Sequence, residues 1–376
     1  MKIIIVGPAY PLRGGIANFN EALCNALNKA GHDTAIYSFS LQYPSMLFPG
    51  KTQLDSGKGP VGLRIVTCLN SINPFNWVTT ARKIKAEKPD LVIFRFWLPF
   101  MGPSLGTVAR LLRKHTTVIA ITDNVIPHEK RPGDAALTGY FIKSCQGFIA
   151  MSRAVLEELT QFTDTPHKLF LPHPLYDQFG EKQERGEALK ALGLPEKDRY
   201  LLFFGFIRKY KGLDLLLEAM GDERLSKLDV KLIVAGEYYE DAAVYEAIIQ
   251  KHKLQDRVIL HTHFIPSEKV RSYFCAADMV VQPYRSATQS GVTQIAYHFE
   301  RPMLVTRVGG LAEIVPDKKV GYVTDTTPLS IADALVDFYE NNREAAFTEQ
   351  VKQEKKRFYW STFVEGLLGL YQKIKK

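Results

Sequence analysis

Residues 283–315 read PYRSATQSGVTQIAYHFERPMLVTRVGGLAEIV, and they are the most informative segment of the chain. A strand ends at Pro283, and a polar loop that contains Gly291 opens a helix, which we expect to run to Glu300. A second strand, residues 303–305, ends in two glycines. Strand, glycine loop and helix in this order point free backbone N–H groups and the positive end of a helix dipole at one place. The stretch therefore predicts an anion site, best suited to a diphosphate, that needs no dedicated metal ion.

Length and cysteine usage narrow the class of protein. The chain has 376 residues, which is too many for one ordinary core and suits two domains. The four cysteines lack the spacing of a zinc site or a disulfide framework, so we expect buried free thiols in a reducing compartment. Residues 1–7 are predicted as a first β-strand and not as a signal peptide. No apolar run approaches the ~20 residues of a membrane span, and the expected location is the cytoplasm.

The net charge of +8 comes from one half of the chain. Residues 1–175 contain 19 Lys and Arg against 11 Asp and Glu, whereas residues 176–376 contain 29 of each kind. Solvated helix faces account for such an excess in many proteins. The alternative is an acidic partner of the N-terminal half, either a phosphorylated acceptor or an anionic membrane surface. No nucleic-acid partner is expected, because no helix-turn-helix, zinc-finger or RNA-binding signature is present.

Short apolar strands alternate with amphipathic helices twice along the chain. The expected strands are residues 3–6, 34–37, 91–94, 118–121 and 148–151, followed by 200–204, 231–235, 258–260, 279–282 and 303–305. This alternation predicts an α/β fold with two Rossmann-like, doubly wound parallel-sheet domains that face each other across a cleft. The boundary is expected near Pro172-His173-Pro174. We therefore predict an N-terminal domain over 1–175, a C-terminal domain over 176–357 and a terminal helix over 358–376.

Two glycine-containing loops follow predicted strands, where open parallel sheets bind their ligands. Gly14-Gly15 precedes the first helix, so the backbone can approach a ligand closely there, although a plain flexible loop is an equally good interpretation. It is not a GxGxxG dinucleotide fingerprint. Arg208, Lys209 and Lys211 lie between the strand 200–204 and the next helix. Three cations in that position suit a diphosphate better than they suit an ordinary charged surface.

Two further polar positions follow predicted strands. His128 comes after the strand 118–121, among Asp123, Asn124 and Glu129. A lone histidine is more often structural or merely exposed, but this setting favours contact with a polar substrate. Glu237 directly follows the strand 231–235 and is a weaker candidate of the same kind.

The order of these motifs resembles glycosyltransferase family 4, whose members are retaining enzymes of the GT-B fold that use nucleotide sugars. The resemblance spans nearly the whole chain. It rests on Gly14-Gly15-Ile16, the loop from Gly205 to Gly212, Ala235-Gly236-Glu237, and residues 258–266, 276–283 and 308–315. The terminal helix is similar to the one that crosses back onto the N-terminal domain in that fold.

The resemblance implies a role for each candidate residue. The C-terminal domain would bind the nucleotide diphosphate sugar and the N-terminal domain the acceptor. Arg208 and Lys211 would neutralise the diphosphate, and His128 would contact the transferred sugar; these three are the expected catalytic residues. Neither a metal ion nor a cofactor is expected, because cations and a helix N-terminus can stabilise the departing diphosphate. The expected donor-binding residues are Gly14, Gly15, Glu237, Phe264, Ile265, Gln289, Ser290, Gly291, Val292 and Gln294.

The chain departs from the family pattern at two places. The family usually has two glutamates eight positions apart at the start of the opening segment. The corresponding positions here are Ala287 and Ile295, or Thr288 and Ala296 in the neighbouring register, and none is a glutamate. We expect Gln289 and Gln294 to act as neutral substitutes that hydrogen-bond the sugar or ribose. Phe206 stands where an arginine often follows the glycine, so Arg208 is expected to take over that arginine's charge.

The acceptor is harder to predict. Residues 94–103 and 73–77 are rich in aromatic side chains, for which core packing is the favoured interpretation. Basic residues at 82–85 and 110–114 would, together with exposed rings, suit shallow membrane contact. We therefore expect a glycan or lipid-linked acceptor, in the assembly of a cell-surface glycan or glycolipid by a hexosyltransferase-like enzyme at the inner membrane face. Two alternatives stay open: a non-catalytic sugar-nucleotide or glycan-binding protein, and a sugar-nucleotide epimerase of the same fold.

Overall fold

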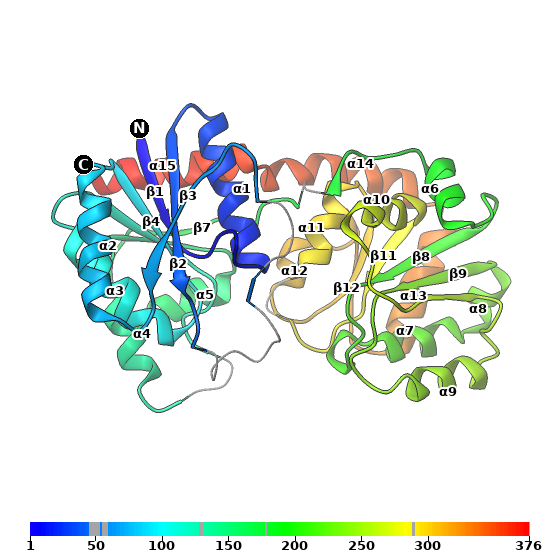
Figure 1. The fold of residues 1–376 in the computed structure, drawn as a ribbon. Helices are drawn as coiled ribbons and strands as arrows, with labels where there is room; N and C mark the ends of the chain where they lie inside the picture. The colour runs from blue at the N-terminus through cyan, green and yellow to red at the C-terminus, as the bar shows by residue number, and fades with distance from the viewer. Residues whose placement is uncertain (45–52, 55–58, 128–130, 177–178, 288–289, 376) are drawn as a thin grey trace. The chain divides into compact units, whose positions relative to one another are not determined.

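The chain folds into two compact units. The computed structural model describes residues 1–44, 53–54, 59–127, 131–176, 179–287 and 290–375 (Figure 1). The N-terminal unit consists of Met1–Pro172 and Trp360–Lys376, and the C-terminal unit of His173–Tyr359. The sequence places these divisions after residues 175 and 357. Within the described ranges, no helix is long and apolar enough to cross a membrane.

The N-terminal unit is built on a parallel sheet of seven strands in the order β3-β2-β1-β4-β5-β6-β7. Its strands are β1 Lys2–Val6, β2 Asp33–Leu41, β3 Arg64–Asn70, β4 Leu91–Phe96, β5 Thr117–Thr122, β6 Gly147–Ala150 and β7 Lys168–Phe170. Its helices are α1 Gly15–Lys29, α2 Pro74–Ala86, the short 3-10 turn η2 Pro99–Met101, α3 Gly102–Leu112, α4 Asp134–Ile142, α5 Arg153–Leu159 and α15 Trp360–Lys375.

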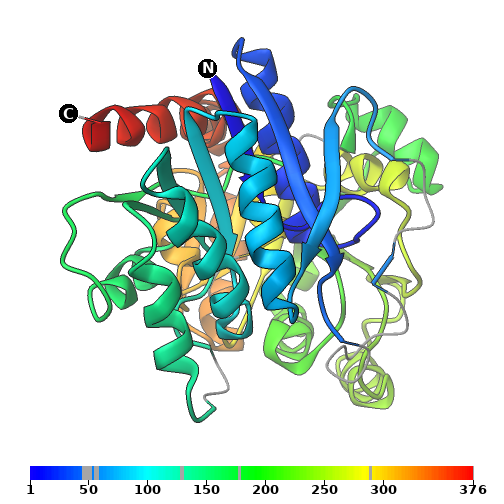
Figure 2. The same cartoon turned by 60° about the vertical axis from the view of Figure 1, so that its left-hand side comes forward.

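Successive side chains along each strand point to opposite faces of this sheet, and each face has its own hydrophobic core. Ile3 and Ile5 of β1 pack with α1 and α15, whereas Ile4 and Val6 pack with α2, α3, α4 and α5. The terminal helix α15, drawn in red in Figure 2, therefore packs on the sheet of the N-terminal unit. It also contacts β5 and β6. The buried face of α15 carries Phe363, Val364, Leu367, Leu370 and Tyr371 at helical spacing.

The C-terminal unit repeats this plan with six parallel strands in the order β10-β9-β8-β11-β12-β13. The strands are β8 Arg199–Phe204, β9 Val230–Ala235, β10 Val258–His261, β11 Met279–Gln282, β12 Met303–Thr306 and β13 Gly321–Thr324. The helices are α6 Arg185–Leu192, α7 Leu213–Met220, α8 Glu223–Lys227, α9 Ala243–Lys251, α10 Ser267–Ala276, α11 Gly291–His298, α12 Leu311–Ile314, α13 Pro328–Glu340 and α14 Glu344–Glu354, with 3-10 turns η4 Lys209–Lys211 and η5 Lys355–Phe358. The predicted fold class, two Rossmann-like parallel-sheet domains, is confirmed.

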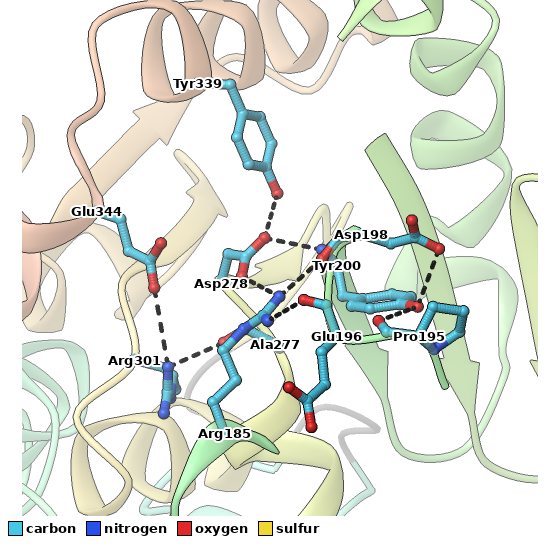
Figure 3. A network of polar contacts seen from close by, with 10 residues as sticks. All are labelled: Arg185, Pro195, Glu196, Asp198, Tyr200, Ala277, Asp278, Arg301, Tyr339 and Glu344. Atoms are coloured by element: carbon cyan, nitrogen blue, oxygen red, sulfur yellow. Dashed lines mark hydrogen bonds and ion pairs between the residues drawn. The ribbon is translucent and has the colours of Figure 1, made fainter. Parts of the chain in front are cut away.

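A buried carboxylate fastens the amino-terminal ends of β8 and β11 to the surrounding helices (Figure 3). Asp278 is 3% exposed and accepts hydrogen bonds from Tyr200 N at 2.8 Å, Arg185 Nη2 at 3.1 Å and Tyr339 Oη at 3.2 Å. These donors come from β8, α6 and α13. Next to it, Arg301 Nη1 donates to the carbonyl of Ala277 at 3.1 Å. Burial raises the pKa of Asp278, and the cation of Arg185 opposes that effect.

We predict that Asp278→Ala lowers the free energy of unfolding by about 3 kcal/mol or more, because it leaves buried donors without their acceptor. Asp333→Ala is the control, since Asp333 is an exposed partner of Arg224 and should cost less than about 1 kcal/mol. Urea unfolding followed by circular dichroism measures both variants. Equal losses for the two would contradict a central role for Asp278.

Candidate functional site

The candidate site lies at the carboxyl-terminal edge of the sheet in the C-terminal unit. All six strands are parallel, so the loops that follow them emerge at this one edge. The strand order reverses between β8 and β11, and open α/β sheets bind ligands at such a switch point. The loops after β8, β9, β10 and β11 therefore form the region in which a ligand site is expected.

Two glycines allow the loops after β8 and β9 to touch. Gly205 has φ +99° and Gly236 has φ +142°, and a Cβ atom on Gly236 would lie 2.3 Å from the carbonyl oxygen of Gly205. Beyond them, Ile207 N donates to Glu237 O at 2.8 Å, and Tyr239 N donates to Ile207 O at 3.0 Å. The predicted residue Glu237 therefore sits on a backbone that is fixed against the basic loop, with its side chain half-buried.

The loop after β8 carries three cations, Arg208, Lys209 and Lys211, that lack an acidic partner among the residues that the structure describes, and two of them lie against aromatic rings. The Arg208 guanidinium lies over the ring of Tyr239, 4.7 Å from its centroid, and is exposed. Lys211 Nζ lies 5.7 Å from the centroid of the Tyr284 ring. Burial and, secondly, the charge of Arg208 lower the pKa of Lys211 to about 8. An anion placed here would be met by two cations whose charge is not otherwise compensated.

Close packing brings Lys211 next to the start of α11. A Cβ atom on Gly205 would lie 2.9 Å from Lys211 Nζ and 3.9 Å from Val292 Cγ2, so the glycine leaves space for the lysine. Gly212 has φ +69°, and a Cβ atom on it would lie 2.0 Å from the carbonyl oxygen of Pro283. The loop after β8 thus rests directly on the loop after β11. Any side chain at position 212 would push the two loops apart.

The helix α11 begins at Gly291, where the sequence predicts an anion-binding terminus. Ser290 is buried, and its Oγ lies 3.4 Å from Tyr284 Oη instead of capping the helix. Gly291 is exposed, and a Cβ atom on it would lie 3.2 Å from Cε2 of Tyr176. The first turn, with Val292, therefore presents backbone N–H groups without a side-chain cap from the described residues. Gln289, also predicted here, lies outside those residues.

The side-chain amide of Gln294 on α11 is buried, and it has no hydrogen-bond partner among the described residues. Gln294 is 1% exposed, and neither its Oε1 nor its Nε2 has a hydrogen-bond partner in the described part of the chain. Its neighbour Thr293 donates from Oγ1 to Gln282 Oε1 at 3.1 Å, which leaves Gln282 Nε2 also without a partner. Buried amide groups are normally hydrogen-bonded, so these atoms mark a place where a ligand or water would satisfy them.

An exposed aromatic ring follows β10. Phe264 is 65% exposed, and the adjacent Ile265 is half-buried against the core of the C-terminal unit. Just before them, His261 Nδ1 lies 2.9 Å from Tyr273 Oη, which holds the end of β10 against α10. Phe264 is therefore a flat apolar surface presented at the edge where the cations lie.

The predicted residues of the N-terminal unit follow its first and fifth strands. Gly14 has φ +123°, Gly15 opens α1, and no described atom lies within 4 Å of a Cβ atom built on either. His128 lies outside the described residues, as does Glu129. Asp123, from the same predicted cluster, accepts hydrogen bonds from Nε and Nη2 of the buried Arg95.

Sequence reasoning missed two ion pairs at these loops. Arg95 interrupts the apolar strand LVIFRF, and a charge inside such a strand is a signal that it has a buried partner. The second pair joins Arg285 to Asp214, with Nη1 and Nη2 at 2.6 and 2.7 Å from the two carboxylate oxygens. Neither pairing can be read from one sequence, because the partners are far apart along the chain.

Each folded unit matches a model of a known protein family. The family model described as Glycosyltransferase Family 4 matches residues 13–173, and the model described as Glycosyl transferases group 1 matches residues 198–341. The two matches together follow the two folded units. The chain therefore belongs to glycosyltransferase family 4, as the resemblance implies, and its relatives are named glycosyltransferases.

Relatives by sequence are named glycosyltransferases, and similar solved structures share the fold. The chain is 24% identical to a D-inositol 3-phosphate glycosyltransferase of Corynebacterium urealyticum, over 76% of this chain and 72% of the relative. It is 22% identical to the uncharacterized glycosyltransferase MJ1607 of Methanocaldococcus jannaschii, over 99% and 98%. A glycosyltransferase from Rickettsia africae has a TM-score of 0.71 at 16% identity, covering 100% and 98% of the two chains. Anabaena HepE in complex with UDP has a TM-score of 0.69 at 14% identity, covering 100% and 98%.

We predict that Gln294→Met does not destabilise the protein and raises its free energy of unfolding by up to about 1 kcal/mol. The methionine is close in shape and removes buried polar atoms that have no partner. Thr293→Val is the control and should cost about 1 kcal/mol, because it removes a hydrogen bond to Gln282. Chemical denaturation measures both. A Gln294→Met variant as destabilised as the control would mean that the Gln294 amide already has a partner.

Proposed function

We propose that this protein transfers a sugar from a nucleotide diphosphate sugar to an acceptor hydroxyl with retention of configuration. The observation that carries the proposal is the pair Arg208 and Lys211, without acidic partners among the described residues, beside the uncapped start of α11. Cations and helix N-termini are suited to phosphate groups. Related folds support the donor class, because Anabaena HepE was solved in complex with UDP and with UDP-glucose.

In this proposal each group at the edge of the C-terminal sheet has one task. Lys211 and Arg208 hold the diphosphate, and the backbone of Ser290, Gly291 and Val292 adds N–H donors. Phe264 and Ile265 offer an apolar surface for the base. Glu237 and Gln294 hydrogen-bond the sugar or ribose, and for Gln294 the support is its unpartnered amide. For Gly14, Gly15, Gln289 and His128 the roles implied by the family resemblance stay predictions.

The reaction would proceed on one face of the sugar. The acceptor oxygen bonds to the anomeric carbon while the bond from that carbon to the diphosphate oxygen breaks, and the hydroxyl proton passes to the departing diphosphate. The enzyme's contribution is to stabilise the negative charge that develops on the leaving group. Lys211, Arg208 and the N-terminus of α11 would supply that positive charge, and we propose that transfer is independent of a divalent metal.

A second candidate function is a non-catalytic protein that binds a sugar nucleotide. The observation that favours it is the lack of a carboxylate at the two positions where the family usually has glutamates. Ala287 and Ile295, or Thr288 and Ala296, stand there instead. Binding of a nucleotide sugar without any transfer or hydrolysis would select this candidate, and interconversion of nucleotide sugars would select an epimerase.

For the acceptor, we propose a lipid-linked or glycan substrate reached at an anionic membrane surface. The structure places Phe94, Phe96 and Met101 in the core, so those side chains are not available for membrane contact. Phe75, at the start of α2, is 85% exposed, and Ile72 just before it is 52% exposed. The same helix carries Arg82, Lys83 and Lys85, and basic residues beside exposed apolar side chains favour the interface of an anionic bilayer.

We predict that UDP or a UDP-sugar raises the melting temperature of the wild-type protein, and that Lys211→Ala weakens this binding about tenfold or more. Because the pKa of Lys211 is about 8, the lysine loses its charge as the pH rises through that value. UDP affinity should therefore fall between pH 7 and pH 9 in the wild type and much less in Lys211→Ala. Calorimetric titration with EDTA present measures both effects.

Lys227→Ala is the matched control, because Lys227 is an exposed lysine on α8 of the same unit. It should bind UDP as the wild type does. A wild-type affinity that does not change with pH, or that requires an added divalent ion, would contradict the assigned role of Lys211. If no nucleotide sugar in a full panel raises the melting temperature, the donor proposal is refuted.

We predict that the protein co-sediments with vesicles that contain phosphatidylglycerol more than with neutral phosphatidylcholine vesicles. Phe75→Ser and a double Arg82→Glu, Lys83→Glu variant should each reduce the bound fraction severalfold, because they remove the apolar and the electrostatic contribution. Val244→Ser is the control, since Val244 is a 58% exposed apolar residue of the C-terminal unit. Sedimentation that is insensitive to anionic lipid content would refute the membrane proposal.

A further inference from the structure

Arg285 ties the loop after β11 to the loop that carries the two cations. Its guanidinium forms the bidentate pair with Asp214, in the first turn of α7. The same Nη1 donates to the carbonyl oxygen of Lys209 at 3.0 Å. The backbone N–H of Arg285 donates to the carbonyl oxygen of Tyr210 at 2.6 Å. One residue thus makes four hydrogen bonds across the two loops.

These bonds hold the short turn that ends in Lys211. Within the turn, Lys211 N donates to Arg208 O at 2.8 Å and Gly212 N donates to Lys209 O at 3.1 Å. The carbonyl of Lys209 therefore accepts from the turn itself and from Arg285. Tyr284, over which Lys211 Nζ lies, is the residue directly before Arg285. The segment Tyr284-Arg285 therefore both bonds to the turn and supplies the ring against which Lys211 lies.

The charge of Arg285 is already neutralised, unlike that of Lys211. The hydrogen bonds to Asp214 raise the pKa of Arg285, and both side chains are only about one-third exposed. An isolated ion pair on the surface contributes little to the stability of the folded protein. This pair differs because it is bidentate and shielded, and because its guanidinium also donates to the carbonyl of Lys209. Such planar contacts with arginine fix geometry. Arg285 is therefore suited to orienting the loop and not to binding the diphosphate itself.

We propose that Arg285 and Asp214 are positioning residues for glycosyl transfer, which hold Lys211 in the half-buried place where it neutralises the donor diphosphate. This inference rests on the proposed role of Lys211 in donor binding. Releasing the clamp would let Lys211 move into solvent, where its amine would regain the ionisation of an ordinary lysine. Among the described residues, the titratable groups that face Lys211 are Arg208 from its own loop and Tyr284 from the loop after β11.

The first test needs no ligand. The pH dependence of reductive methylation at Lys211, read by peptide mass spectrometry, reports the fraction of neutral amine. In the wild type the midpoint should lie at about 8. In Arg285→Ala it should rise by about one pH unit or more, toward the value of a solvated lysine. Arg285→Lys should give an intermediate midpoint, because one ammonium cannot replace the bidentate contact. Asp214→Asn offers a second, milder way to release the clamp.

The second test uses UDP as the probe. Arg285→Ala should weaken UDP binding about tenfold, and the double variant with Lys211→Ala should bind no more weakly than Lys211→Ala alone. Arg224→Ala is the matched control, because Arg224 on α8 forms a bidentate pair with Asp222, the residue that precedes this helix. Its melting temperature reports the general cost of losing such a pair. In this variant, neither the midpoint pH of methylation at Lys211 nor the affinity for UDP should change.

The outcomes separate this inference from the donor proposal. A Lys211 midpoint that stays at its wild-type value in both Arg285→Ala and Asp214→Asn would overturn the inference. Additive losses of UDP affinity would also overturn it, because Arg285 would then contact the ligand independently of Lys211. A midpoint that moves, in a protein that binds neither UDP nor any other nucleotide diphosphate, would support the clamp and refute the proposed donor site.

Discussion

The parallel pairing of β8 between β9 and β11 is the constraint on which the rest of the C-terminal unit depends. Backbone hydrogen bonds align Phe204 with Ala235 on one side and Leu202 with Val280 on the other. Because the strands are parallel, three loops leave the sheet at one edge, and they have little room there. The glycines at 205, 212 and 236 relieve that crowding, since each adopts a positive φ and two of them touch a carbonyl of the next loop. The position of the cations is thus a consequence of strand pairing.

Within that frame, two kinds of cation have different tasks. The guanidinium of Arg285 is paired with the carboxylate of Asp214 and with the carbonyl of Lys209, so its charge is compensated and its geometry is fixed. Arg208 and Lys211 are in contact with aromatic rings, which stabilise a cation without neutralising it. A site that must attract a diphosphate needs the second kind, and a loop that must keep its shape needs the first. Their separation on adjacent loops is what makes the donor proposal and the clamp distinguishable by experiment.

The sequence predicted the two-domain parallel fold because apolar strands alternate with amphipathic helices over nearly the whole chain. It missed β3, β7 and β13, which lie at sheet edges. Edge strands are short or carry polar residues, as in Arg64–Asn70, so their pattern is weak. Residues that follow strands were placed at the correct edge, since that depends only on strand direction. Pairings such as Arg285 with Asp214 could not be predicted, because they depend on how two distant loops meet.

The neutral residues in the proposed donor site change its electrostatics. A carboxylate near the start of α11 would offset part of the charge of Lys211 and would raise its pKa. With glutamines in this region, the strongest local influences on Lys211 are burial and the like charge of Arg208, and both lower its pKa. Near pH 8 a substantial fraction of Lys211 is therefore neutral before a ligand arrives. A bound diphosphate would favour the charged form, so donor binding and proton uptake by Lys211 would be linked. In this proposal, binding of the diphosphate itself returns Lys211 to its charged form, and the family glutamates are not required for that protonation.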